Sequence, residues 1–158
     1  MGFRGRIRLA QLDEIDTWLN SLGLSNLDRI RVYRRNLQKM IAAHDRGELE
    51  ELQQVIEYDE AREIFWSYVD ADEFVRAVGA LRESLGDDVA AAPIERALKG
   101  PADLFLENPN NSDGRNFMFE LITAARFAAA GFRPSFDQGP DVQVDFAGLR
   151  VAIQCKRP

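Results

Sequence analysis

Residues 140–158 read PDVQVDFAGLRVAIQCKRP, and their pattern predicts the local structure of the last third of the chain. Apolar and polar residues alternate over 141–146 and again over 149–156, which is the period of a half-buried strand. Ala147 and Gly148 lie between the two runs and suit a two-residue loop. The pattern therefore predicts a β-hairpin.

A two-residue loop places Phe146 opposite Leu149 and, counting outward, Asp141 opposite Gln154. One face of the hairpin is then wholly apolar. On the other face the Asp141 carboxylate lies beside the Gln154 amide, with Lys156 one diagonal step further. A four-residue loop would shift the pairing but keep these faces. The hairpin is thus expected to gather an acceptor pair and an ammonium group at its open end.

Pro140-Asp141 on one strand and Gln154-x-Lys156 on the next resemble the motif of the PD-(D/E)xK nuclease superfamily. The resemblance implies that Asp141 binds Mg²⁺ or Mn²⁺ and that the backbone carbonyl of Cys155 is another ligand. It also implies that Lys156 orients the attacking water or steadies developing charge. Gln154 stands where Glu or Asp is usual. Its amide oxygen can still ligate Mg²⁺, and some branches of the superfamily use Gln-x-Lys.

Residues 117–130 are nearly all apolar or Ala and end at Gly131, which predicts a helix packed on the sheet. Nucleases of this type often place a Glu on the first core helix, so the resemblance makes Glu120 a candidate catalytic and metal-binding residue. The alternative is that Glu120, Thr123 and Arg126 form a narrow solvated stripe. Partial burial of Glu120 would favour a metal partner, because a buried carboxylate needs one.

Upstream of this helix the chain is expected to be helical. Gly and Pro residues and apolar spacings predict helices at 9–22, 25–44, 48–69, 71–85 and 87–98. The turn formers at 108–113 mark a linker. The predicted fold class is α+β: a helical domain over 1–107, then the start of a restriction-endonuclease-like α/β core over 114–158, with one helix and three strands including a short one at 132–136.

The resemblance also implies that such a core continues with a further helix and a fourth strand, so 114–158 is expected to be a truncated piece. The strand at 149–156 would then be an unprotected sheet edge, a feature that soluble proteins avoid. Missing C-terminal residues, a second copy in a homodimer or a partner chain could complete the sheet. We expect the isolated chain to be inactive as a nuclease and dimeric or prone to aggregation.

Charge is divided unevenly along the chain, whose formal net charge is −6. Residues 1–47 carry +4, residues 48–113 carry −12 and residues 114–158 carry +2. A phosphate backbone would be repelled by the middle segment, so nucleic acid should lie along the other two. The single Cys and single His cannot build a structural zinc site together. No run is apolar enough to span a membrane, and we expect a cytoplasmic protein.

Arg31, Arg35 and Lys39 recur every four residues on the predicted second helix and form a basic stripe. Such a stripe could hold phosphates, and a solvated helical face is the equal alternative. The favoured function is metal-dependent hydrolysis of nucleic acid, with DNA favoured over RNA. In the alternative, the nuclease-like half is an inactive binding module or the helical half is a protein-interaction domain.

Overall fold

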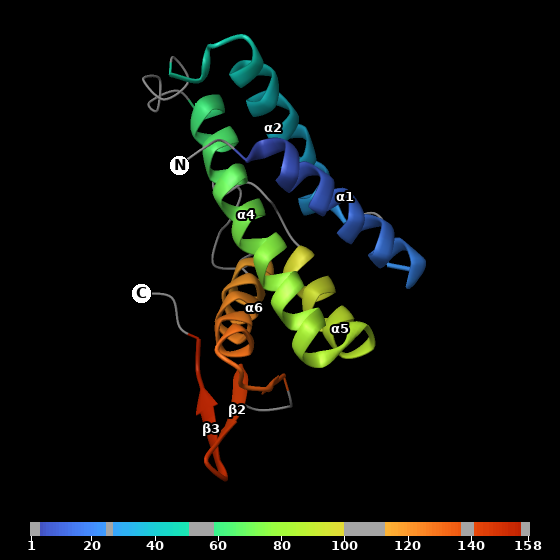
Figure 1. The fold of residues 1–158 in the computed structure, drawn as a ribbon, viewed down its shortest axis with the longest axis vertical. Coiled ribbons are helices and arrows are strands. Elements are labelled where there is room, and N and C mark those ends of the chain that lie inside the picture. The colour runs from blue at the N-terminus through green and yellow to red at the C-terminus, as the bar shows by residue number, and fades with distance from the viewer. Residues whose placement is uncertain (1–3, 25–26, 51–58, 100–112, 137–140, 156–158) are drawn as a thin grey trace. The chain divides into compact units, whose positions relative to one another are not determined.

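The computed structural model describes residues 4–24, 27–50, 59–99, 113–136 and 141–155. Within these ranges it has five helices followed by a three-stranded antiparallel sheet (Figure 1), which confirms the α+β class with an N-terminal helical part. The helices and strands are α1 (Gly5–Ser21), α2 (Asp28–Asp45), α4 (Asp59–Leu85), α5 (Asp87–Leu98), α6 (Asp113–Ala129), β1 (Pro134–Ser135), β2 (Val142–Phe146) and β3 (Leu149–Ile153).

The first of two compact units contains α1, α2 and the part of α4 up to Val75. Apolar residues at helical spacing on α1 and α2 form its core, because most of them are buried while the intervening residues are mostly exposed. The rings of Tyr33 and Phe74 lie 6.3 Å apart, centroid to centroid, and join α2 to α4. The largest buried apolar side chains of this unit are Leu12, Leu19, Ile30, Tyr33, Leu37 and Phe74.

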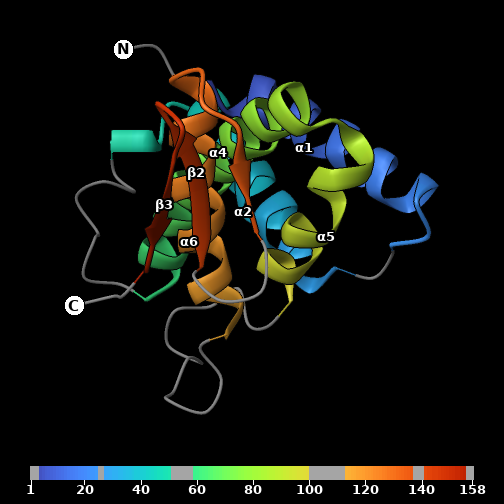
Figure 2. The same ribbon diagram turned by 90° about the horizontal axis from the view of Figure 1, so that it is seen from below.

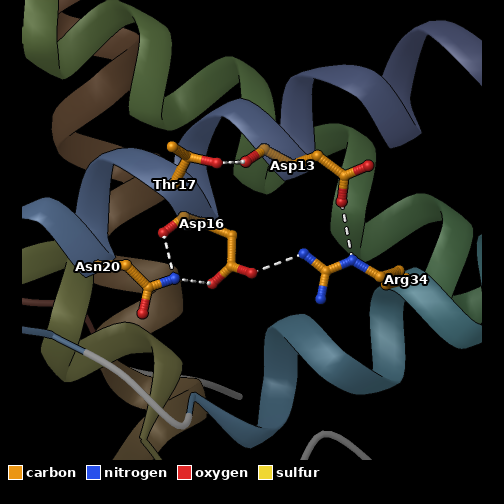
Figure 3. Close-up of polar contacts among 5 residues, drawn as sticks. All are labelled: Asp13, Asp16, Thr17, Asn20 and Arg34. Atoms are coloured by element: carbon orange, nitrogen blue, oxygen red, sulfur yellow. Dashed lines mark hydrogen bonds and ion pairs between the residues drawn. The ribbon is translucent and has the colours of Figure 1, made fainter.

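Arg34 joins α2 to α1 through two carboxylates (Figure 3). Its Nε donates to Asp13 at 2.7 Å and its Nη2 to Asp16 at 2.6 Å. These bonds raise the pKa of the Arg34 guanidinium, with Asp16 as the larger cause. Asn20 donates to the same Asp16 carboxylate at 3.3 Å, so the acceptor is itself held in place. A guanidinium that bridges two carboxylates in this way fixes the relative position of two helices better than a single exposed ion pair.

α4 is one continuous helix, so the prediction of separate helices at 48–69 and 71–85 is wrong at their junction. Residues 51–58, in the middle of the helix predicted at 48–69, lie outside the described residues. Buried positions recur three and four residues apart through the junction, as one helix requires. They are Ile64, Ser67, Ala71, Phe74, Val78 and Leu81.

The second unit begins at Arg76 and contains the end of α4, α5, α6 and the sheet. α5 matches the helix predicted at 87–98, and α6 packs against it with Leu121 and Ala124 fully buried. After α6, Gly131 at φ 87° donates to the carbonyl of Ala128, and Phe132 donates to that of Phe127. This pair of bonds is a Schellman motif. It ends the helix where predicted and turns the chain into β1.

The hairpin has the predicted register. The paired residues of β2 and β3 are Phe146 with Leu149, Val144 with Val151 and Val142 with Ile153. Ala147 and Gly148 have φ values of 49° and 81°, as a type I′ two-residue turn requires. β1, at 134–135, is shorter than predicted and pairs with β2 on the other side.

α6 covers one face of this small sheet (Figure 2). Val142 and Val144 of β2 are 0% and 3% exposed beneath it. A row of rings continues the contact: the centroid of Phe132 is 6.1 Å from that of Phe127 on α6 and 5.7 Å from that of Phe146 on β2. Because α6 and the hairpin share this core, the residues at their ends are held in a defined relation to each other.

β3 is the outer strand of the sheet within the described residues, and its apolar side chains are poorly covered. Leu149 and Val151 of β3 are 69% and 45% exposed, and Phe146 at the end of β2 is 55% exposed. Uncovered apolar side chains beside an open strand edge are the arrangement expected from the sequence.

The predicted domain boundary at 108–113 stays a prediction, because residues 100–112 lie outside the described ranges. The two compact units divide elsewhere, within α4 between Val75 and Arg76. Among the described helices, none is both long and apolar enough to cross a membrane.

Candidate functional site

Asp141 directly precedes β2, and its carboxylate reaches the chain just after β3. Its Oδ2 accepts a hydrogen bond from the backbone N–H of Cys155, with 2.5 Å between the two atoms. A short bond from an amide to a carboxylate is charge-assisted and stronger than a neutral one. The structure therefore brings two of the predicted site residues together at the open end of the hairpin.

Glu120 comes from α6, which packs on the sheet, and lies within electrostatic reach of Asp141. Its side chain is half-buried. Burial raises the pKa of the Glu120 carboxyl, and the negative charge of Asp141 raises it further, while Arg96 acts in the opposite direction. Two carboxylates that repel each other in a partly desolvated place are a common feature of sites that bind cations.

Cys155 and Thr123 complete this group. Burial raises the pKa of the Cys155 thiol, a hydrogen bond with the side chain of Thr123 lowers it, and the charges of Asp141 and Glu120 raise it again. Thr123 is thus turned toward the end of the hairpin. The alternative in which Glu120 and Thr123 belong to a purely solvated stripe does not describe these contacts.

Of the other two predicted site residues, Gln154 and Lys156, the structure describes only Gln154. Gln154 follows β3 and is exposed. Continuing the register by one step sets it opposite Asp141, as the sequence predicts. Lys156 lies outside the described residues, so its expected role remains a prediction.

The donor set decides how well a divalent cation fits. Within the described residues no group of three or more His, Cys, Asp or Glu side chains gathers closely enough to hold a metal ion. Mg²⁺ is commonly held by only one or two carboxylates and keeps several waters. Glu120 and Asp141 supply two carboxylates whose repulsion a cation would relieve, and Gln154 offers an amide oxygen. These residues fit Mg²⁺ or Mn²⁺ and do not fit zinc, which prefers His and Cys.

The predicted basic stripe on α2 is exposed, but each of its three cations forms an ion pair with a carboxylate. Arg31 pairs with Asp28 on its own helix. Two carboxylates of α4 hold the other members, Glu63 with Arg35 at 2.9 Å and Glu60 with Lys39 at 2.7 Å. The sequence shows no acid within the stripe, and only the packing of α4 beside α2 supplies the last two. These pairs reduce the positive potential that a phosphate backbone would meet.

Two residues near the candidate site have no counterpart in the sequence-based predictions. Arg96 of α5 interacts with Glu120, and its Cζ lies 3.9 Å from the ring centroid of Phe117. Gln143, two residues after Asp141, buries its Oε1 without a hydrogen-bond partner among the described residues. The polar phase of Gln143 in β2 is visible in the sequence. For Arg96 no local pattern exists, since it lies in the acidic middle segment and only α5–α6 packing places it.

Comparisons with protein-family models, with curated proteins and with solved structures find no match to this chain. Any function assigned to the chain therefore rests on the geometry of the site and on the resemblance of its motif.

Proposed function

We propose that this protein is a divalent-metal-dependent nuclease whose site is built from Glu120, Asp141, Gln154 and the backbone at Cys155. The observation that carries the proposal is that Glu120 of α6 and Asp141 before β2 lie within electrostatic reach of each other. Burial raises the pKa of Glu120, and the charge of Asp141 raises it further. The resemblance to the PD-(D/E)xK motif adds the nuclease chemistry and the role of Lys156. Nucleic acid, with DNA favoured over RNA, is the proposed partner.

Each residue has a part that its position supports. The Cys155 N–H holds Oδ2 of Asp141, which orients the carboxylate and leaves Oδ1 without a hydrogen-bond partner among the described residues. Glu120 supplies the second charge, on a helix packed against the sheet. When bound, a divalent cation supplies Lewis-acid stabilisation of the charge that develops on the phosphoryl oxygens. Partial burial around Glu120 and Cys155 strengthens such charge interactions because it limits screening by water.

Metal binding to this chain tests the donor set. We expect Mg²⁺ or Mn²⁺ to raise the melting temperature of the wild type and to have little effect on Asp141→Asn or Glu120→Gln. Asp145→Asn is the matched control, since Asp145 lies on the same strand and is exposed, paired with Arg150 at 3.3 Å. Any metal-dependent cleavage of a labelled DNA duplex by the wild type should be lost in the same two variants. Equal metal shifts in all four proteins would refute the site.

A second candidate function is an inactive, nuclease-like binding module. The identity of Gln154 favours it, because a neutral amide adds no charge to the two carboxylates and so weakens the hold on a divalent cation. This candidate predicts DNA binding that is unaffected by a chelator and no cleavage with any divalent metal. Chelator-sensitive binding together with metal-dependent cleavage would exclude it.

A further inference from the structure

Arg96 is held in an unusual way for an exposed arginine. It lies in the last turn of α5, and its Cζ is 3.9 Å from the ring centroid of Phe117 on α6. A guanidinium at that distance over an aromatic ring gains a cation–π interaction. Stacking on the ring restrains the guanidinium plane, and the N–H donors at the edge of that plane take no part in the stacking contact. Arg96 is therefore restrained without the use of its hydrogen-bonding edge.

That edge has no partner in the part of the chain that the structure describes. Neighbouring cations differ in this respect. Lys99, the residue directly after α5, binds Glu95 at 2.9 Å, and Arg82 at the end of α4 binds Asp87 at 2.7 Å. No ion pair within 4.0 Å holds Arg96 among the described residues, although Glu120 is within longer electrostatic reach. A guanidinium with open donors thus lies within electrostatic reach of Glu120.

The chemistry of this group suits a phosphodiester. A guanidinium presents parallel N–H donors that match two phosphate oxygens, and it remains charged at all working pH values. Glu120 lies one turn along α6 from Phe117, the residue on which Arg96 stacks. A phosphate bound at Arg96 would therefore lie next to the proposed cation site.

We propose that Arg96 is a phosphate-binding residue of the candidate site, supplied by α5 and oriented by Phe117 to take a backbone phosphate of nucleic acid. This inference rests on the proposed function for its substrate. It assigns phosphate recognition to a cation in the acidic middle segment, in place of the basic stripe on α2, whose members are paired.

The proposal predicts effects of opposite sign on two ligands. Arg96→Met keeps the packing over Phe117 but removes the charge and the donors. It should weaken binding of a labelled DNA duplex in Ca²⁺ by about tenfold and reduce the salt slope by about 1. The same change should tighten Ca²⁺ binding by about threefold, measured by melting, because a cation near Glu120 is gone. Loss of a purely structural residue would weaken both ligands.

Lys99→Met is the matched control, since it removes one positive charge at the end of α5, three residues after Arg96. It should change both affinities much less than Arg96→Met. Arg96→Lys keeps the positive charge but lacks the parallel N–H donors of the guanidinium. Its DNA affinity should fall between those of the wild type and Arg96→Met. Similar losses of DNA affinity in Arg96→Met and Lys99→Met would overturn the proposal, and so would a DNA affinity unchanged in Arg96→Met.

A metal-free version separates this inference from the proposed function. The double variant Glu120→Gln, Asp141→Asn removes the repulsion that the two carboxylates exert on phosphate, so it should bind the duplex in a chelator. Adding Arg96→Met to it should then lower DNA affinity by a similar factor. That loss supports the role of Arg96 even if no metal-dependent cleavage is found. If Arg96→Met does not lower DNA affinity in this background, the role of Arg96 is overturned. The nuclease proposal is still tested separately, by the effect of metal on the melting temperatures of Asp141→Asn and Glu120→Gln.

Discussion

The hydrogen bond between Asp141 and Cys155 gives the candidate site a stability signature that differs between two substitutions of one residue. In the metal-free protein the Asp141 carboxylate has two opposing effects. It stabilises the hairpin by accepting the Cys155 N–H at 2.5 Å, and it destabilises the fold by repelling Glu120. Asp141→Ala removes both effects, whereas Asp141→Asn keeps an acceptor oxygen and removes only the charge.

The sizes of the two effects decide the outcome. A hydrogen bond to a charged group contributes about 1.5–3 kcal/mol net, and the partial exposure of Asp141 favours the lower end. Repulsion between two partly screened carboxylates is about 0.5 kcal/mol. Asp141→Ala should therefore destabilise the protein by about 1 kcal/mol, or about 3 °C in melting temperature. Asp141→Asn should lie within about 0.5 kcal/mol of the wild type, because a weaker neutral bond is offset by the lost repulsion.

Urea and thermal unfolding in a chelator measure these differences, and amide hydrogen exchange at Cys155 reports the bond directly. Exchange should be fast in Asp141→Ala and slow in Asp141→Asn and the wild type. Asp145→Ala controls for the loss of a carboxylate from β2. The reasoning is refuted if Asp141→Asn is as destabilised as Asp141→Ala, or if Cys155 exchanges at the same rate in all of these proteins.

Three further predictions concern single residues. The raised pKa of Glu120 means that its contribution to stability is fully present below the ordinary glutamate pKa of about 4.3 and is lost as the pH rises through the raised value. Glu120→Gln should therefore be more stable than the wild type at pH 7.5 without metal, with the difference vanishing below about pH 4; equal melting curves at both pH values would contradict this. Arg34→Met should destabilise the first unit by about 1–2 kcal/mol in urea unfolding, because Asp13 and Asp16 both lose the guanidinium that they bind. An effect near zero would mean that these two ion pairs are surface contacts without a role in stability. Val151→Lys should reduce self-association of the chain in sedimentation. An antiparallel pairing of β3 with a second copy, centred on Val151, sets Arg150 opposite Ala152 and brings no like charges together, whereas a lysine at 151 would face the same lysine of the second copy. A wild type that is monomeric at all concentrations would contradict this prediction.

Much of the local structure was predictable from the sequence, because its causes are local. Alternation with a period of two sets the faces of β2 and β3, and a two-residue loop at Ala147 and Gly148 then allows only one register, which the structure has. The end of α6 at Gly131 follows from the need for positive φ after a helix. Asp141 beside the end of β3 follows from that register alone.

Other features were decided by tertiary packing. Glu120 lies within electrostatic reach of Asp141 because of the way α6 packs on the sheet, whereas the sequence left a solvated stripe as the alternative. The pairs that Arg35 and Lys39 make with α4 depend on how two helices approach, and no spacing within α2 contains that information. The same holds for the stacking of Arg96.

The division between the two classes has a physical reason. Strand phase, turn conformation and helix ends depend on backbone sterics and hydrogen bonds within a few residues, so residue types report them directly. A charge at the end of a long side chain gains little from any one partner, and its pairing follows from where packing of apolar side chains such as Leu121 and Val142 sets the helices and strands. The sequence by itself therefore determined the hairpin and which face of it is apolar. Tertiary packing is what brings Glu120 within electrostatic reach of Asp141 and stacks Arg96 on Phe117 nearby.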